Sequence, residues 1–398
     1  MPSQASLPEV VTLGCRMNLS ESEAIRALLA NAATPTVVVN SCAVTAEAVR
    51  QSRRAVRRLR RDHPEARLLV TGCAATIDPT GFAAMDEVDG VVDNLAKLDP
   101  SRWQVPAPAQ AVAPSERHTR AFVAVQNGCD HACTFCIIPA GRGASRSVPV
   151  AGVLEIVAGH MAHGVAEVVL TGVDLTSWGA DLPAPARLGD LVAAILRAFP
   201  ALPRLRLSSV DGVEIDPLLL ELLCHEPRVM PHVHLSLQSG ADMVLKRMKR
   251  RHTRAQALAL VETLRRHRPE MAIGADLIAG FPTEDQAMHA DNLSIVTEAQ
   301  IVHGHVFPYS PRPGTPAARM PQVPPPLVRE RAAELRAAVG QARAQWLAGL
   351  VGRPAQVLAE RDGTGHSPDF APYRLPAGTV PGSLVTLKPE RIEEGMLA

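Results

Sequence analysis

Residues 126–139 read QNGCDHACTFCIIP and place three cysteines in the spacing C-x3-C-x2-C. Thiolates are soft ligands that suit zinc, copper(I) or an iron–sulfur cluster. A structural zinc site is closed by four ligands, and the only nearby fourth candidate is His131, inside the same short loop. Cys129, Cys133 and Cys136 therefore predict a metal or cluster site with one open coordination position. A zinc knuckle and a disulfide loop are the alternatives.

The composition is that of a soluble globular protein with two or three domains. The chain has 398 residues, of which 46% are apolar and 20% charged. It shows no secretory leader pattern and no apolar run of about 18 residues, so we expect a cytoplasmic protein without a membrane partner. Its seven cysteines are better metal or catalytic candidates than disulfides in that compartment. The net charge of +1 means that any RNA partner must be argued from local patches.

The N-terminal part of the chain alternates short β-branched runs with helical stretches, which predicts a parallel sheet. Ser20, with Glu23 three residues later, predicts a capping box at the start of the first helix. We expect strands at 10–13, 37–40 and 68–71, and helices near 20–30 and 44–61.

Three more cysteines each follow one of these predicted strands. Cys15, Cys42 and Cys73 all lie within about three residues of a strand's carboxyl end. Ligands of open α/β sheets gather at that edge, so we expect the three thiols to converge. Buried core cysteines are the alternative, but these would lie within the strands. The pattern predicts a second set of three ligands.

A Pro-rich stretch, 100–114, separates this part from a second series of strands and helices and is predicted to be an extended linker. Six βα units predict an incomplete TIM-like barrel with its site at the carboxyl ends of the strands. A long helix, 327–350, and a small all-β appendix, 352–398, would follow. We expect the barrel strands at 121–125, 166–171, 203–208, 232–237, 272–277 and 302–307, and helices at 188–199, 254–267 and 284–299.

Four further stretches complete a family pattern: TGVDLTSWG (171–179), HLSLQSGADMVLKRMKRRHT (234–253), GADLIAGFPTED (274–285) and FPYSPRPGTP (307–316). With both cysteine triads, they make the chain resemble the methylthiotransferases of the radical S-adenosylmethionine (SAM) superfamily over almost its whole length. The resemblance implies an α/β fold with three parts. These are an N-terminal parallel-sheet domain (1–99), a linker (100–117), a central partial (β/α)6 TIM-like radical SAM barrel (118–350) and a short all-β TRAM-like domain (351–398).

The resemblance also implies cofactors and their ligands. Two 4Fe-4S clusters and SAM are expected, and the residues beyond the cluster ligands receive no catalytic role. The auxiliary cluster would be held by Cys15, Cys42 and Cys73, and the SAM-binding cluster by Cys129, Cys133 and Cys136. Residues expected to line the SAM site are Phe135, Thr171, Gly172, Val173, Ser208 and Gln238.

Three groups within this family act on different substrates: isopentenyladenosine in tRNA, threonylcarbamoyladenosine in tRNA, and an aspartate of a ribosomal protein. The first and last usually follow the cysteine loop with RG-x-E-x-SR, whereas residues 141–146 read GRGASR and lack the glutamate. The resemblance therefore favours methylthio transfer to C2 of N6-threonylcarbamoyladenosine at tRNA position 37. Its partners would be the tRNA anticodon stem-loop, an electron donor such as flavodoxin or ferredoxin, and a sulfur donor.

Arginines on the predicted helix 46–61 supply the RNA hypothesis. They recur at helical spacing, which places them on one face, and no acid separates them. This pattern predicts phosphate contacts, with a solvated surface as the alternative. The set comprises Arg50, Arg53, Arg54, Arg57, Arg58 and Arg61.

Other features receive simpler interpretations. Cys224 is expected in the core, and His303 and His305 are expected to be structural. The basic run 246–254 is open between RNA contact and the SAM site. From Arg353 onward five Lys or Arg face six Asp or Glu, which argues against phosphate binding by the appendix. A zinc- and RNA-binding module without catalysis is the hypothesis from a different class.

Overall fold

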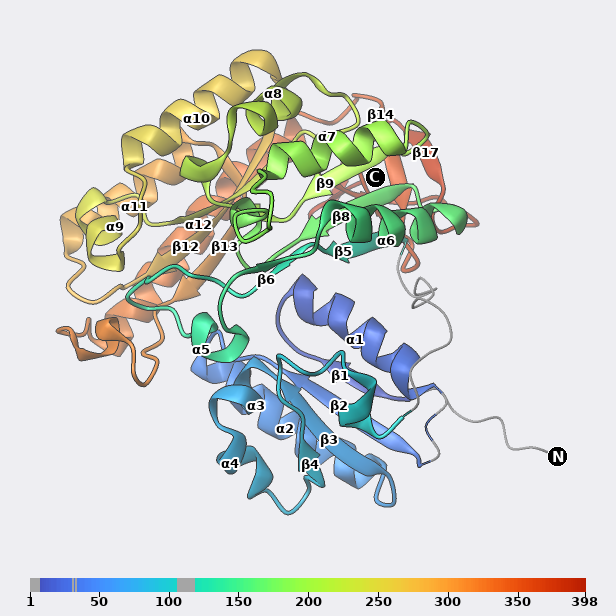
Figure 1. The fold of residues 1–398 in the computed structure, drawn as a ribbon. Coiled ribbons are helices and arrows are strands. Elements are labelled where there is room, and N and C mark those ends of the chain that lie inside the picture. The colour runs from blue at the N-terminus through green and yellow to red at the C-terminus, as the bar shows by residue number, and fades with distance from the viewer. Residues whose placement is uncertain (1–7, 31, 33, 106–118) are drawn as a thin grey trace.

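The computed structural model describes residues 8–30, 32, 34–105 and 119–398. Three parts follow one another along the chain: an N-terminal α/β part, the barrel strands and a small C-terminal sheet. Figure 1 shows the N-terminal part below the barrel strands, with helix α1 between them. In the described part of the chain, the helices are too short or too polar to cross a bilayer.

The N-terminal sheet is parallel, with the order β1-β2-β3-β4. Aliphatic residues such as Val38, Leu69 and Val70 are buried within it, as expected of a parallel sheet covered on both faces. Its elements are β1 (Val10–Thr12), α1 (Arg16–Leu29), β2 (Thr36–Ser41), α2 (Ala46–Asp62), β3 (Arg67–Gly72), α3 (Cys73–Ile77), α4 (Pro79–Ala83) and β4 (Gly90–Val91).

The predicted capping box is wrong. Helix α1 begins at Arg16, directly after Cys15, so Ser20 lies inside the helix. The Ser20 hydroxyl instead donates a hydrogen bond to the carbonyl oxygen of Phe122 at 3.1 Å. A residue within a helix has its backbone N–H already bonded four residues back, so the side chain is free to join α1 to a barrel strand.

The central part is an open, curved sheet of parallel strands. One ladder runs β5-β8-β9 and the next β10-β11-β12-β13, and only Ser208 separates β9 from β10. Val233, Ile273 and Ile301 pack into the apolar layer beneath the helices. Its elements are β5 (Arg120–Ala124), β6 (Gln126–Asn127), α5 (Ile138–Arg142), β7 (Arg146–Ser147), α6 (Val150–Ala162), β8 (Glu167–Thr171), α7 (Leu188–Ala198), β9 (Arg204–Leu207), β10 (Ser209–Val210), α8 (Pro217–His225), β11 (His232–Gln238), α9 (Asp242–Met248), α10 (Arg254–His267), β12 (Ala272–Ala279), α11 (Gln286–Glu298) and β13 (Ile301–Pro308). Three short 3-10 turns, η2 (Leu175–Ser177), η3 (Gly212–Glu214) and η4 (Pro316–Arg319), lie in the connecting loops.

After helix α12 (Pro325–Ala348) the chain ends in a small, mainly antiparallel sheet ordered β17-β14-β15-β16-β19-β18. This sheet packs against the amino ends of the barrel strands, where Arg204 donates to the carbonyl of His366 at 3.2 Å and Arg120 pairs with Glu360 at 2.7 Å. The cysteine loop lies at the opposite end. The strands are β14 (Ala355–Ala359), β15 (Thr364–His366), β16 (Pro372–Arg374), β17 (Leu384–Leu387), β18 (Ile392–Glu393) and β19 (Met396–Leu397).

The stretch predicted as an extended linker is not extended at its start. Pro100–Trp103 form a 3-10 helix, η1, and Trp103 is buried against Ile25 and Leu28 of α1. The Trp103 indole also donates to the carbonyl of Lys97 at 2.8 Å. One aromatic side chain therefore ties this segment to the N-terminal core. The rest of the predicted linker, residues 106–117, lies outside the described residues.

Candidate cluster and cofactor site

The central cysteine loop begins where β5 and β6 end and is held by neighbouring backbone. Gly128 has φ +77°, and a Cβ there would lie 1.9 Å from the carbonyl oxygen of Ala144, so only glycine fits. The Gln126 amide donates to the Gly128 carbonyl at 2.8 Å and accepts from the Asp174 N–H at 2.9 Å. Gln126 thus fixes the loop relative to the carboxyl end of β8.

Each sulfur of this loop faces one nitrogen donor. The N–H groups of His131 and Ile138 lie 3.4 Å from the sulfurs of Cys129 and Cys136, respectively. The third sulfur, that of Cys133, lies 3.7 Å from the guanidinium of Arg250.

Burial raises the pKa of Cys129 to about 12 and that of Cys136 to about 11. Buried thiols of this kind ionise when a metal takes their protons' place. The soft donor set with one N–H per sulfur fits a 4Fe-4S cluster.

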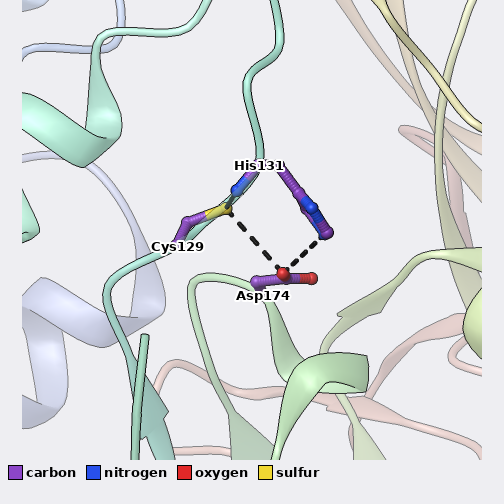
Figure 2. A group of neighbouring side chains, drawn as sticks. All are labelled: Cys129, His131 and Asp174. Carbon is purple, nitrogen blue, oxygen red and sulfur yellow. Dashed lines mark hydrogen bonds and ion pairs between the residues drawn. The ribbon is translucent and has the colours of Figure 1, made fainter. Parts of the chain in front are cut away.

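His131 is turned away from ligation. Its Nε2 lies 2.7 Å from Asp174 Oδ2 and 3.6 Å from Glu214 Oε2, and Figure 2 shows the ring facing Asp174. The hydrogen bonds to Asp174 and Glu214 raise the pKa of His131 to about 10. A protonated imidazole has no free lone pair for a metal, so the three thiols keep an open fourth position. In neutral form, Cys129, His131 and Asp174 offer ligand atoms within 4.8 Å of one another, which is the zinc alternative.

The second triad also converges. Cys15 caps the start of α1, Cys42 follows β2 and Cys73 starts α3. Cys42 and Cys73 follow Ser41 and Gly72, which are paired in register on β2 and β3, and burial raises the pKa of both thiols. Gly14 lies against Cys42, since a Cβ there would be 2.7 Å from its sulfur. Cys15 is exposed, whereas Cys42 and Cys73 are buried, so this site is open on one side.

The two triads adjoin. Cys73 contributes to the electrostatic environment of the Cys136 thiol. A Cβ on Gly141, in helix α5, would lie 3.1 Å from Cys73 Cβ. The Asn94 amide donates to the Gly141 carbonyl at 2.7 Å and lies 3.8 Å from the Cys73 sulfur. The wall of the N-terminal site is therefore built partly by the helix that follows the central loop.

A buried ionic group joins the same two parts. Arg142 donates to Glu21 at 2.9 and 3.0 Å and to the Asn18 amide oxygen at 2.5 Å. The Lys97 ammonium binds the same carboxylate of Glu21. Burial would raise the pKa of Glu21, but Lys97 and Arg142 together hold it below its usual value. Local sequence patterns could not reveal this group, because its members lie on three segments far apart in the chain.

The residues expected to line the SAM site differ in what their side chains do. The Thr171 hydroxyl donates to the Val123 carbonyl at 3.2 Å, so only the backbone after β8 is free to face a ligand. Phe135 packs edge-on against Phe281, with ring centres 6.4 Å apart. The Ser208 hydroxyl is buried and has no hydrogen-bond partner among the described residues.

The remaining expected SAM-site residues lie at strand ends. Gly172 lies against Gln126, whose Oε1 would be 3.0 Å from an added Cβ. Val173 is half-buried in the loop after β8, and Gln238 ends β11 with φ +69°.

The basic run 246–254 serves the cluster loop. Arg250 binds Asp211 at 2.8 Å as well as facing Cys133, and Arg251 binds Glu214 at 2.6 Å. The acid partners come from the loop after β10, which carried no sequence signal for this role. These contacts favour the second of the two readings of the run.

The arginine face of α2 is less free than the helix sequence predicts. Acids from elsewhere pair with it: Asp78 binds Arg53 at 2.8 Å, and Glu87 lies 3.8 Å from Arg57. Glu47 in the first turn binds Arg50 at 2.6 Å and lies 3.6 Å from Arg54. Arg58 and Arg61 are exposed without an ion pair in the described part of the chain. The face therefore combines paired and free cations.

Cys224 is buried in the barrel core, as expected. The histidines of β11 and β13, in contrast, line the concave side of the barrel sheet. His234 and His305 each lie 3.1 Å from Asp276 Oδ1. Nδ1 of His303 lies 2.9 Å from Arg343, while its Nε2 has no partner among the described residues. His232 is buried with both ring nitrogens unpartnered there. A purely structural role accounts for the hydrogen bonds of His305 but not for these open nitrogens.

Comparisons with known proteins agree with this geometry. The model of the Radical SAM superfamily matches residues 123–293, and that of the Uncharacterized protein family UPF0004 matches residues 9–93. Among solved structures, the radical SAM methyltransferase TsrM from Kitasatospora setae with tryptophan and a SAM analogue bound has a TM-score of 0.55. At 14% identity, over 82% of this chain and 81% of that one, this likeness shows the fold alone. The fold and the central loop define a radical SAM enzyme, which uses SAM and a 4Fe-4S cluster.

Sequence relatives narrow this class. The chain is 41% identical to the threonylcarbamoyladenosine tRNA methylthiotransferase MtaB of Rickettsia prowazekii (strain Madrid E), over 98% of this chain and 96% of the relative. It is 32% identical to the MtaB of Thermotoga maritima, over 88% and 86%. It is also 32% identical to the tRNA-2-methylthio-N(6)-dimethylallyladenosine synthase of Erythrobacter litoralis (strain HTCC2594), over 89% and 86%. The chain belongs to the radical SAM methylthiotransferase family, whose members carry two 4Fe-4S clusters.

Proposed function

We propose that this enzyme inserts a methylthio group at C2 of N6-threonylcarbamoyladenosine at tRNA position 37. The observation that carries the proposal is the adjacency of two cysteine triads, joined through Cys73, Asn94 and Gly141. Sulfur insertion into an aromatic C–H bond needs both a radical source and a sulfur carrier, and neither is available to ordinary side chains. Two open sites that share a wall supply both at one place.

The choice of nucleoside rests on the relatives. Identity to an enzyme named for threonylcarbamoyladenosine reaches 41%, against 32% for one named for dimethylallyladenosine. The GRGASR stretch at 141–146 supports the same choice. A ribosomal-protein substrate and a dimethylallyladenosine substrate are the alternatives within the family.

The chain's own residues would divide the work as follows. Cys129, Cys133 and Cys136 would hold the cluster that binds SAM, and this cluster would supply the electron for reductive cleavage of SAM. Arg250 would place a positive charge beside this cluster, because its guanidinium lies 3.7 Å from the Cys133 sulfur. An ion pair with Asp211 fixes the guanidinium there. The triad of Cys15, Cys42 and Cys73 holds the auxiliary cluster on the side where Cys15 is exposed. Phe135, Gly172, Val173, Ser208, Gln238 and the Thr171 backbone line the SAM site.

The arrangement of domains and partners follows from this function. We place the N-terminal domain at 1–99, the linker at 100–117, the radical SAM domain at 118–350 and the TRAM-like domain at 351–398. The partners are the tRNA anticodon stem-loop, an electron donor such as flavodoxin or ferredoxin, and a sulfur donor, in the cytoplasm. Arg58 and Arg61, exposed and unpaired among the described residues, are the best phosphate contacts on α2.

Nucleoside analysis of tRNA from a deletion strain tests the substrate. The expected result is loss of 2-methylthio-N6-threonylcarbamoyladenosine and recovery of the unmethylthiolated nucleoside, with restoration by the gene supplied in trans. Loss of the dimethylallyladenosine derivative instead would assign the enzyme to the other tRNA group. Unchanged tRNA with a lighter ribosomal protein would overturn the RNA substrate. A colourless purified protein that holds zinc would overturn the assignment as an iron–sulfur enzyme.

A further inference from the structure

We propose that Arg16 binds the carboxylate of the threonyl group and so selects this substrate; the inference rests on the proposed function. Arg16 is the first residue of α1 and directly follows Cys15. The guanidinium carbon lies 5.6 Å from the centre of the Phe370 ring, which comes from the C-terminal sheet. Arg16 thus reaches from a proposed cluster ligand to the amino ends of the barrel strands, where Phe370 lies.

Two other arginines surround the same ring, and both have their own acids. Arg206 lies 4.8 Å from the Phe370 centre and binds Glu167 at 2.7 and 3.2 Å. Arg120 lies 5.1 Å from that centre and binds Glu360 at 2.7 Å. These acids hold the two arginines in place.

Arg16 differs from both, because no hydrogen bond or ion pair joins it to any described residue, although it is half-buried. Glu167 is also shared with Arg204 at 3.7 Å. Four arginines, Arg16 included, therefore lie near three carboxylates around Phe370, those of Glu167, Glu360 and Asp369. Glu167 and Glu360 attract Arg16 from a distance, but among the described residues no carboxylate binds it directly. A half-buried guanidinium without a directly bound acid is costly unless an anion completes its hydrogen bonds.

Unpartnered histidine nitrogens lie in the same group of side chains. The His232 ring centre is 5.2 Å from that of Phe370 and 5.1 Å from that of His303. His232 is 4% exposed, and neither of its ring nitrogens has a hydrogen-bond partner among the described residues. Buried polar atoms of this kind await a ligand or water. Among the described residues, the amino ends of the barrel strands thus bring together Arg16, which has no ion pair, and further hydrogen-bonding atoms.

The chemistry of the substrate fits this arrangement. The threonylcarbamoyl group carries a carboxylate, which a guanidinium binds through two parallel hydrogen bonds. A dimethylallyl group has no charge and would leave Arg16 and His232 unpartnered. Sites built to bind a polar group reject analogues that lack it far better than apolar sites reject an added group. Because Cys15 and Arg16 are neighbours, the anchored carboxylate would keep the base close to the auxiliary cluster.

The test uses the reconstituted holoenzyme and two anticodon stem-loops. One carries N6-threonylcarbamoyladenosine, and the other carries its threoninamide analogue, which has the same shape without the charge. We expect wild-type enzyme to favour the acid in kcat/KM. Arg16→Met should lower kcat/KM for the acid by about 10- to 100-fold, leave the amide almost unchanged, and so remove the preference. Arg16→Lys should keep part of it.

Controls separate recognition from folding. Iron content and SAM cleavage without RNA should be unchanged in Arg16→Met, and Arg266→Met, which removes an exposed arginine paired with Glu262 on α10, should behave as wild type. If Arg16→Met loses iron, the test rests on the wild-type enzyme and its two substrates. Equal kcat/KM for the acid and the amide would then overturn the inference. A preserved acid preference in Arg16→Met overturns it while the proposed function stands. Wild-type turnover of dimethylallyladenosine only overturns both.

Discussion

The Arg142 guanidinium, which follows the central cysteine loop, binds both carboxylate oxygens of Glu21 in α1, at 2.9 and 3.0 Å. Both side chains are almost fully buried, and Lys97 binds the same carboxylate. One acid therefore balances two buried cations at the junction between the N-terminal sheet and the barrel. Because of this imbalance, Glu21 and Arg142 are expected to contribute unequally to stability.

Glu21→Gln should destabilise the apo protein more than Arg142→Met. The first change leaves Lys97 and Arg142 buried without a carboxylate, which costs about 3–5 kcal/mol. The second leaves a neutral pair of Glu21 and Lys97. Urea denaturation midpoints check the order, with the exposed Glu262→Gln as a control. Equal midpoints for the two variants would show that the carboxylate is not the centre of the group.

The same group predicts a pH dependence. The folded-state pKa of Glu21 is lowered by Lys97 and Arg142 against the opposing effect of burial. Its contribution to stability is therefore complete above the pKa of an unfolded glutamate and is lost as the pH falls through the folded-state value. Unfolding free energies of wild type and Glu21→Gln, measured over acid pH, should converge as the pH is lowered. A constant difference between them would contradict this.

Iron content tests the ligands. After anaerobic reconstitution the wild type should hold about eight iron atoms, because each of two triads fits a 4Fe-4S cluster. Alanine at Cys129, Cys133 and Cys136 should leave about four. Cys224→Ala, a buried core cysteine, is the matched control and should keep the full content. A triple variant with wild-type iron would remove the assignment.

The two triads should separate by activity. Alanine at Cys15, Cys42 and Cys73 should preserve reductive cleavage of SAM to 5′-deoxyadenosine and abolish methylthio transfer. Both products are quantified in one anaerobic reaction. Methylthiolated nucleoside from this variant, or loss of SAM cleavage in a variant that keeps about four iron atoms, would contradict the division of labour.

The arginine face of α2 is tested by its salt dependence. Arg58 and Arg61 are exposed without ion pairs in the described part of the chain, so Arg58→Glu with Arg61→Glu should weaken tRNA binding and flatten its salt slope by roughly one unit per lost phosphate contact. Arg57→Glu, next to Glu87, should have a smaller effect. SAM cleavage without tRNA should not change. An unaltered slope would mean that the face is solvated only.

Sequence patterns predicted the strands well because burial of aliphatic runs is a local property. Helix α10 has the predicted bounds, Arg254–His267, and strand β11, His232–Gln238, matches the predicted 232–237 to within one residue. Helix α1 began earlier than predicted because Cys15, a weak capping residue, starts it without a side-chain hydrogen bond. Trp103 shows why the linker prediction was wrong at its start: proline content suggested extension, but one buried indole sufficed to fold the segment back.

The candidate site divides in the same way. Cysteine spacing and position after strand ends predicted both triads, and the structure places Cys42 and Cys73 after the neighbouring strands β2 and β3. Their role as cluster ligands stays a prediction. Asp211 and Asn94 were hidden, because they meet these loops only through tertiary structure. Arg250 was not hidden, since the basic run 246–254 was one candidate for the SAM site. The arginine face was overestimated for a similar reason. Acidic residues that do not belong to α2 lie beside its arginines in the folded protein, as Asp78 does beside Arg53.

The contact of Gly141 with Cys73 bears on how the enzyme matures. Residue 141 is synthesised after Cys73, so an auxiliary cluster held by Cys73, as proposed, would lack this part of its wall until α5 is made. We therefore expect stable assembly of that cluster to follow synthesis of α5. Side chains larger than glycine at position 141 would impair this late step. Biogenesis of the two cofactors is in this sense ordered by the chain itself.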